Sequence, residues 1–160
     1  TVQALYAGEP TFISPVHEAV LRLIASTGES INAAKTVIIG NSEVFTQPLK
    51  HLLEKAGCFV NIQSPDELRP HELKAAKIII CAVGRIGFLT SELISDNAIV
   101  IDVGTNKNAE GKTVGDVDVT HLQDRDIFLS PVPGGVGPLT IALLLKNVVQ
   151  ACESGQARTA

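Results

Sequence analysis

One stretch constrains this chain more than any other: SPVPGGVGPLT, residues 130–140. Three prolines and three glycines lie within eight residues of it. Proline fixes φ and removes an N–H donor, whereas glycine allows positive φ and close approach, so the loop is expected to be stiff and bare. The apolar sequence that follows predicts a long helix whose free N–H groups face the loop. This arrangement suits a flat or anionic ligand lying against main chain; the alternative is a connection that needs these residues only for its shape.

The composition is typical of one globular domain. The chain has 160 residues, of which 45% are hydrophobic and 19% charged, and this content is enough for a sizeable core. A net charge of −4 argues against a general nucleic-acid binder, which needs a basic face. No apolar run is long enough to span a bilayer. Because the chain contains no methionine, we expect a processed product or a piece of a longer polypeptide.

The cysteines and histidines predict neither a disulfide nor a metal centre. Cys58, Cys81 and Cys152 are odd in number and scattered, which favours buried, reduced thiols in a cytoplasmic protein. The pair His71-Glu72 lacks the second histidine of a zinc-binding helix.

Strand-like and helix-like segments alternate along the chain. The predicted strands are 36–40, 59–62, 77–83, 98–104 and 126–129, and the predicted helices are 15–25, 48–56, 66–76 and 140–152. This alternation predicts an α/β fold of the Rossmann-like kind, a twisted parallel sheet with helices on both faces. We expect residues 1–152 to form this domain and residues 153–160 to be a flexible tail.

Several of the predicted strands end in glycine or a small polar residue, and ligands of open parallel sheets bind beyond these carboxyl ends. Segments 40–42, 84–87, 104–106 and 133–135 are therefore expected to gather at one edge. Gly40, Asn41 and Ser42 lie between a strand and its helix, where a pyrophosphate rests on helix N–H groups. Gly84 lets an adenosine or ribose approach the backbone. A plain turn is the alternative at both positions.

The end of the second strand normally separates NAD from NADP. Here it reads QSPDE, residues 63–67, with no arginine or lysine for a 2′-phosphate. Asp66 or Glu67 could accept hydrogen bonds from a ribose diol, or could instead place a charge at the start of the next helix. Asp102 and Asp116 could be read as paired catalytic carboxylates, but structural hydrogen bonding to loops is the favoured role for both.

Several motifs together carry a family resemblance: VIIGNS (37–42) with Pro48, AVG (82–84), IVIDVGTN (99–106), VGDV (114–117) and residues 131–140. On these residues the chain, from about Tyr6 to Cys152, resembles the C-terminal dinucleotide-binding domain of the bifunctional methylenetetrahydrofolate dehydrogenase/cyclohydrolases. That family oxidises methylenetetrahydrofolate with NADP or NAD and hydrolyses the methenyl product to formyltetrahydrofolate.

The resemblance implies a cofactor-binding half without catalytic residues, since the family's catalytic lysine and tyrosine lie in its N-terminal domain. Folate is held between the two domains, so the chain alone is expected to be inactive. The family also implies a homodimer. By position, residues 40–42 and Ser64 fall in the cofactor loops, Thr105 on the nicotinamide side and Thr140 near the same cleft. The loop that closes over folate and nicotinamide is Pro133, Gly134 and Gly135.

The departures from the family pattern cluster on the dinucleotide side. Asn41 stands where many members have an arginine for the 2′-phosphate, and Ser64-Pro65 replaces the usual His-Ser or His-Arg. Thr46 replaces a glycine and is expected to crowd a cofactor. These changes fit a member that prefers NAD or has lost dehydrogenase function. The alternative is a degenerate, non-redox module for dimerisation or assembly; a general NAD-binding regulatory domain would leave the loop 131–138 unexplained.

Overall fold

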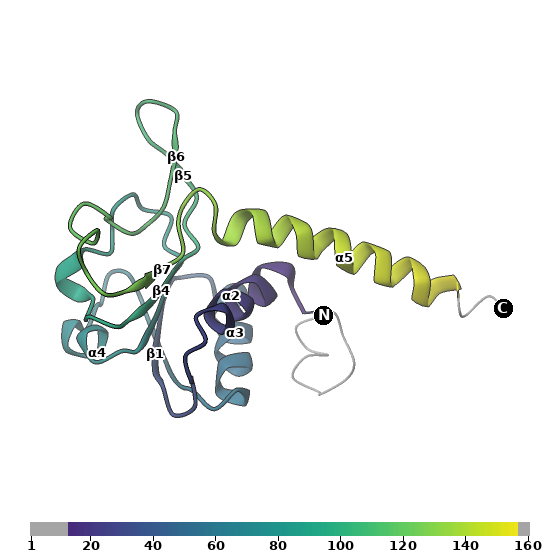
Figure 1. Ribbon diagram of the computed structural model, residues 1–160, viewed down its shortest axis with the longest axis horizontal. Helices are drawn as coiled ribbons and strands as arrows, with labels where there is room; N and C mark the ends of the chain where they lie inside the picture. The colour runs from purple at the N-terminus through teal and green to yellow at the C-terminus, as the bar shows by residue number, and fades with distance from the viewer. Residues whose placement is uncertain (1–12, 157–160) are drawn as a thin grey trace.

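The computed structural model describes residues 13–156 of the chain, and residues 1–12 and 157–160 are outside this description. Its centre is a sheet of five parallel strands (Figure 1) in the order β2-β1-β3-β4-β7. The strands are β1 (Lys35–Ile39), β2 (Phe59–Gln63), β3 (Ile78–Cys81), β4 (Ile99–Asp102) and β7 (Phe128–Leu129).

Helices cover both faces of the sheet, which confirms the predicted fold class. The helical elements are α2 (Pro15–Ser26), α3 (Glu43–Lys55), α4 (Pro70–Lys74), the 3-10 turn η1 (Ser91–Leu93) and α5 (Val136–Gln156). α2, α3 and the start of α5 pack on one face, and α4 and the segment of η1 on the other. A hairpin of β5 (Asn106–Lys107) and β6 (Thr113–Val114) stands away from the sheet (Figure 1).

Successive side chains of a strand point to opposite faces of the sheet. In these strands the side chains on both faces are apolar, as in sheets that are covered on both sides. One core joins α2, α3 and α5 to Ile38, Ile78, Ile80, Ile99 and Ile101. The other joins α4 and the loops that follow β3 and β4 to Val37, Ile39, Ile79, Cys81 and Val100. The continuous β-branched runs in the sequence are thus central strands covered on both faces.

α3, α4 and α5 begin at other residues than predicted. α3 begins at Glu43 and contains Pro48 in its interior, so the expectation that Pro48 lies in the first turn is wrong. The carbonyl of Ser42 accepts hydrogen bonds from the N–H groups of Phe45 and Thr46, which establishes the helix before the proline. α4 begins only at Pro70, because Arg69 precedes a proline and is extended, at φ −111° and ψ 92°.

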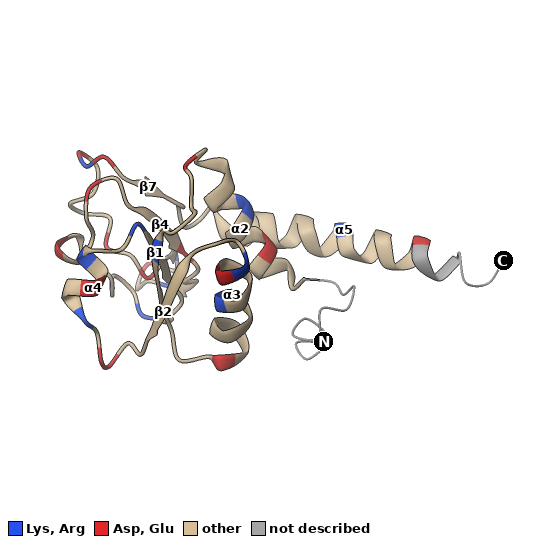
Figure 2. Ribbon diagram, turned by 90° about the horizontal axis from the view of Figure 1, so that it is seen from below, with Lys and Arg blue, Asp and Glu red and all other residues tan. Residues whose placement is uncertain are grey.

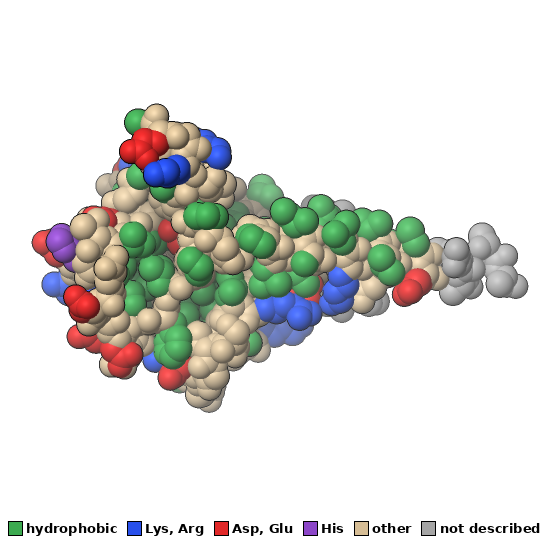
Figure 3. Space-filling view, turned by 45° about the horizontal axis from the view of Figure 1, so that its top comes forward, with side chains coloured by type: hydrophobic (Ala, Val, Ile, Leu, Met, Phe, Trp, Pro, Cys, Tyr) green, Lys and Arg blue, Asp and Glu red, His purple; other side chains and the backbone are tan. Residues whose placement is uncertain are grey.

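α5 is longer than predicted at both ends, because it begins at Val136 and continues to Gln156. The predicted tail therefore begins inside a helix at residues 153–156, and its last residues, 157–160, lie outside the described part. α5 carries few charged side chains (Figure 2), and hydrophobic side chains line its visible side (Figure 3). The exposed apolar residues of this helix are Ile141, Leu144, Leu145, Val148 and Val149.

The described thiols are all unpaired. Cys58 and Cys81 are buried as predicted, but Cys152 is exposed on α5, so the expectation of burial is wrong for this residue. Among residues 13–156, no helix combines the length and the apolar character that crossing a membrane requires.

Candidate functional site

The site lies at the carboxyl ends of β1 and β3, where the order of strands reverses. β1 has β2 on one side and β3 on the other, so the chain leaves β1 towards β2 but leaves β3 towards β4, and a crevice opens between these two connections above Gly40. A Cβ at Gly40 would lie 3.0 Å from the carbonyl oxygen of Ala82. Glycine is therefore needed here for the close approach of the two strand ends.

The N-terminus of α3 faces this crevice, and no side chain caps it with a hydrogen bond. Ser42 is the N-cap residue, and no side chain accepts a hydrogen bond from the first turn. The N–H groups of Glu43 and Val44 are thus available to the oxygens of a ligand, since those of Phe45 and Thr46 already donate to Ser42, and the helix dipole favours a negative charge there. Asn41 and Ser42 are exposed, as is Glu43 in the same turn. A dinucleotide pyrophosphate fits this set of donors.

Thr46 does not crowd the crevice, so that expectation is wrong. Its side chain is only 2% exposed. The Cγ2 atom lies 3.4 Å from the position of a Cβ at Gly40. The methyl group thus packs under the loop and supports it from inside the fold.

Two polar contacts tie the ends of β1, β2 and β3 together. The hydroxyl of Ser64 donates to Oδ1 of Asn41 over 3.1 Å. Arg85, which follows β3, pairs through Nη2 with Oδ1 of Asp66, which follows β2, also over 3.1 Å. The guanidinium of Arg85 also lies 5.8 Å from the centre of the Phe88 ring. The structure thus brings Asn41, Ser64 and Asp66 to the edge at which Arg85, from the predicted segment 84–87, also lies.

Arg85 was not singled out from the sequence. Residues 63–67 contain no cation at the end of β2, yet Arg85 reaches Asp66 there from the end of β3. The signal available in the sequence is an arginine directly after Gly84, at the carboxyl end of a predicted central strand. Strand order decides that this arginine faces Asp66, and the sequence does not give strand order.

The buried carboxylates of Asp102 and Asp116 form a hydrogen-bond network beneath the carboxyl ends of β3 and β4. The carboxylate of Asp102 accepts from the N–H groups of Gly104, Asp116 and Val117. Burial raises the pKa of the Asp102 carboxyl, although these backbone donors favour its ionised form. A Cβ on Gly115 would lie 1.9 Å from Oδ2 of Asp102. This confirms the predicted structural role of Asp102.

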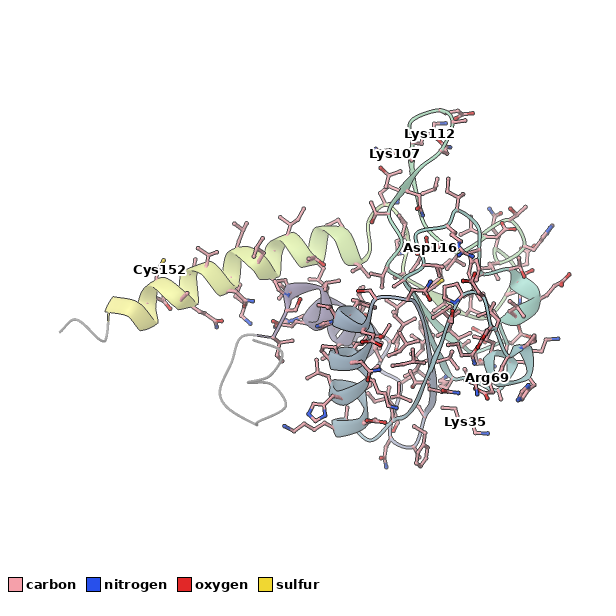
Figure 4. The ribbon with its side chains drawn as sticks, turned by 180° about the vertical axis from the view of Figure 1, so that it is seen from behind. Lys35, Arg69, Lys107, Lys112, Asp116 and Cys152 are labelled. Atoms are coloured by element: carbon pink, nitrogen blue, oxygen red, sulfur yellow. The ribbon has the colours of Figure 1, made fainter. Side chains whose placement is uncertain are left out.

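The carboxylate of Asp116 fixes the loop after β3. It accepts hydrogen bonds from the N–H groups of Val83, Gly84 and Arg85 and from the side-chain amide of Asn106. Figure 4 shows Asp116 below the hairpin. Gly84 has a φ of +71°, and a Cβ there would meet no atom within 4 Å. Its outer side is open, while its N–H is already used.

The loop 131–138 lines a separate pocket of about 220 Å³ with Thr105. The loop is tight: the N–H of Gly135 donates to the carbonyl of Pro131 over 2.8 Å, and a Cβ on Gly135 would lie 2.7 Å from that oxygen. Pro133, Gly134 and Gly135 all line the pocket. Thr140 does not line this pocket, and its hydroxyl donates back to the carbonyl of Val136 over 2.7 Å. Its assignment to the cleft stays a prediction.

No group of three or more histidine, cysteine, aspartate or glutamate side chains within residues 13–156 has the geometry to hold a metal ion. Cys81 lies under the site and is fully buried. Burial, together with the charges of Asp116 and Asp102, raises the pKa of its thiol. Cys81 is therefore a packing residue and not a nucleophile.

Comparisons with known proteins agree on one family. Residues 14–156 match the family model "Tetrahydrofolate dehydrogenase/cyclohydrolase, NAD(P)-binding domain". The bifunctional protein FolD of Verminephrobacter eiseniae is 40% identical over 157 residues, which are 96% of this chain and 54% of that protein. The chain thus spans about half the length of the curated relatives it matches.

Solved structures give the same result. The FolD methylenetetrahydrofolate dehydrogenase/cyclohydrolase of Campylobacter jejuni superposes with a TM-score of 0.86 at 33% identity, covering 96% of this chain and 55% of that one. The enzyme of Trypanosoma brucei, solved in complex with NADP and an inhibitor, superposes with a TM-score of 0.81 at 29% identity. It covers 92% of this chain and 54% of that one.

Proposed function

The chain belongs to the tetrahydrofolate dehydrogenase/cyclohydrolase NAD(P)-binding domain family, and we propose that it is the cofactor-binding half of a bifunctional enzyme of one-carbon folate metabolism. The enzyme would oxidise methylenetetrahydrofolate with NAD(P) and hydrolyse the methenyl product. One observation carries the proposal: the uncapped N-terminus of α3 opens into the crevice between β1 and β3. The T. brucei relative, solved with NADP, supports it.

The residues of this chain bind and orient. Residues 40–42 and the first turn of α3 hold the pyrophosphate, and Gly84 offers an open backbone beside the adenosine. Thr105 and the loop 131–138 form the pocket of about 220 Å³ that receives the nicotinamide end and one side of the folate. The bound cofactor supplies the hydride chemistry.

Catalysis needs groups that this pocket does not provide. Among residues 13–156, its lining consists of apolar residues, glycines and prolines together with Thr105 and Thr113. None of these is a good general base at neutral pH. We therefore propose that folate chemistry requires the other half of the enzyme, and that the 160-residue chain alone binds cofactor without turnover.

Calorimetric titration of the chain with NAD and with NADP tests the proposal. A Ser42→Asp variant keeps a good N-cap residue and so keeps the helix stable, but places a negative charge where the pyrophosphate binds. We expect at least about tenfold weaker binding in this variant. The matched control is Ser14→Asp at the N-cap of α2, which also lacks a side-chain cap. A folded chain that binds neither nucleotide would overturn the proposal in favour of a non-redox module.

We also propose that the chain forms a homodimer, in the cytoplasm, through the open edge of its sheet. β2 is an edge strand of five residues, and Phe59 on it is 68% exposed. β7, at the other edge, has only two residues. Unpaired backbone groups on a long edge strand favour pairing with another chain. Sedimentation equilibrium should give a dimer for the natural chain and a monomer for Phe59→Lys, and a monomeric natural chain would contradict this.

A further inference from the structure

The ion pair between Asp66 and Arg85 crosses the crevice. Asp66 follows β2, Arg85 follows β3, and β1 lies between these two strands in the sheet. The contact of 3.1 Å between Arg85 Nη2 and Asp66 Oδ1 therefore passes over the end of β1. The hydroxyl of Ser64, held by Asn41, also lies 3.3 Å from the N–H of Asp66. Asp66 is thus positioned from two sides.

Two arginines of the described residues 13–156 lie near the end of β2, and both are paired. Arg85 pairs with Asp66, and Arg69 pairs with Glu72 through Nη1 over 2.9 Å. The other end of the Arg69 guanidinium donates to Oδ1 of Asn61 over 3.3 Å. Arg69 also lines the pocket beside Gln63 and Ser64, at the carboxyl end of β2, and its backbone N–H donates to Oε1 of Gln63 over 3.0 Å.

The balance of charge at this end of the sheet is negative. Glu67 lines a pocket of about 550 Å³ beside Ser64 and Arg69. With Asp66, Glu67 and Glu72 against two paired arginines, the surroundings disfavour a further dianion. A 2′-phosphate has no donor to offer a carboxylate, whereas a ribose diol has two O–H groups to donate.

We propose that Asp66, positioned by Arg85, makes the dinucleotide site selective for NAD over NADP. The carboxylate accepts hydrogen bonds from the 2′- and 3′-hydroxyls of the adenosine ribose and repels a 2′-phosphate, which is the general role of an acidic residue beyond the second strand of such folds. Arg85 is a positioning residue: its guanidinium, beside the Phe88 ring, holds the carboxylate at the end of β2. This inference rests on the proposed binding of NAD(P) and adds the choice between the two.

The same contact also provides the decisive test. If Asp66 is neutralised, Arg85 loses its partner and becomes a free cation at the place where a 2′-phosphate would lie. Asp66→Asn should therefore weaken NAD binding and strengthen NADP binding. Arg85→Gln should weaken NAD binding while NADP binding stays poor, because the carboxylate remains.

The experiment is calorimetric titration of the 160-residue chain with both nucleotides, for the natural sequence and for Asp66→Asn, Arg85→Gln and Asp96→Asn. Asp96 is a matched control, because it forms an ion pair with Arg125 over 2.8 Å, and its side chain is 66% exposed, as is that of Asp66. It precedes β4 and so lies at the amino ends of the parallel strands, opposite the carboxyl ends that form the site. Circular dichroism confirms that each variant is folded.

We expect the natural chain to bind NAD at least about tenfold more tightly than NADP, the size of one charge-assisted hydrogen bond. Asp66→Asn should shift that ratio by at least about tenfold towards NADP, and Asp96→Asn should leave it unchanged. Tighter binding of NADP by the natural chain, or an unchanged ratio in Asp66→Asn, overturns the inference while the proposed function stands. Binding of neither nucleotide by the folded chain overturns both.

Discussion

The carboxyl edge of the sheet has two halves that treat their polar groups in opposite ways. Behind β3 and β4, Asp102 and Asp116 are fully buried, and their oxygens are consumed by backbone N–H groups. Above β1 and β2, Asn41, Ser64 and Asp66 meet in exposed contacts. The polar groups of the first half are buried and fully hydrogen-bonded within the protein, whereas those of the second half are exposed and each make few contacts.

The difference separates scaffold from binding surface. Polar groups that are satisfied inside the protein stiffen the chain but have nothing left for a ligand. The N–H groups after β3 are spent on Asp116, whereas those at the start of α3 are free of side-chain caps. A dinucleotide is therefore expected to form its hydrogen bonds with the β1–β2 half, while the β3–β4 half provides the rigid surface against which it packs.

The largest expected effect comes from breaking the buried half. In Gly115→Ala the new Cβ would lie 1.9 Å from Oδ2 of Asp102, so the carboxylate and its backbone donors must move apart. We expect a loss of at least about 3 kcal/mol in the free energy of unfolding, measured with urea. The control is Gly137→Ala, a helical position where a Cβ meets nothing within 4 Å. Equal stability of the two variants would show that the hydrogen-bond network of Asp102 and Asp116 is not rigid.

Thiol reactivity gives the next largest contrast. Cys81 is 0% exposed beneath the hydrogen-bond network of Asp102 and Asp116, and burial raises the pKa of its thiol. Cys152, in contrast, is exposed. With Ellman's reagent, we expect Cys81 to react at least about a hundredfold more slowly than Cys152, because only an opening of the fold exposes it. Cys152→Ser should remove the fast phase. A fast phase that persists in this variant would mean that the buried half opens readily.

Two serines allow the smallest and most direct comparison. The hydroxyl of Ser130 is buried and accepts the N–H of Asp102 over 2.8 Å, while that of Ser64 makes its contact to Asn41 at the surface. Replacement by alanine should cost about 1–2 kcal/mol of unfolding free energy at Ser130 and less than about 0.5 kcal/mol at Ser64. Similar losses at both positions would remove the distinction between the two halves.

The sequence predicts the strands and the edge well, because both follow from local rules. Runs such as 36–40 and 98–104 are continuous and β-branched, and they end in glycine, so their burial and their direction towards a common edge follow from pattern alone. The structural role of Asp102 also followed from its place inside a strand. The start of α3 did not, since Pro48 is a strong signal for a first turn and lies here in mid-helix.

What the sequence could not give depends on which strand lies beside which. Arg85 and Asp66 are 19 residues apart in sequence, and they meet only because β1 separates β2 from β3 by a single strand. The exposure of Cys152 has a similar origin. An apolar helix is normally read as buried, but the part of α5 that carries Cys152 extends beyond the sheet it starts on (Figure 4).

α5 shows that a helix and a cooperative folding unit need not end at the same residue. Its first turns are anchored by Leu143 in the core and by contacts of Lys146 and Asn147 with Glu18 and Ile13. Beyond them, Val148 and Val149 are exposed. A short unsupported helix is only marginally stable in water. Amide protons should therefore exchange slowly up to about Asn147 and quickly after it, so that a boundary of protection falls within one unbroken helix.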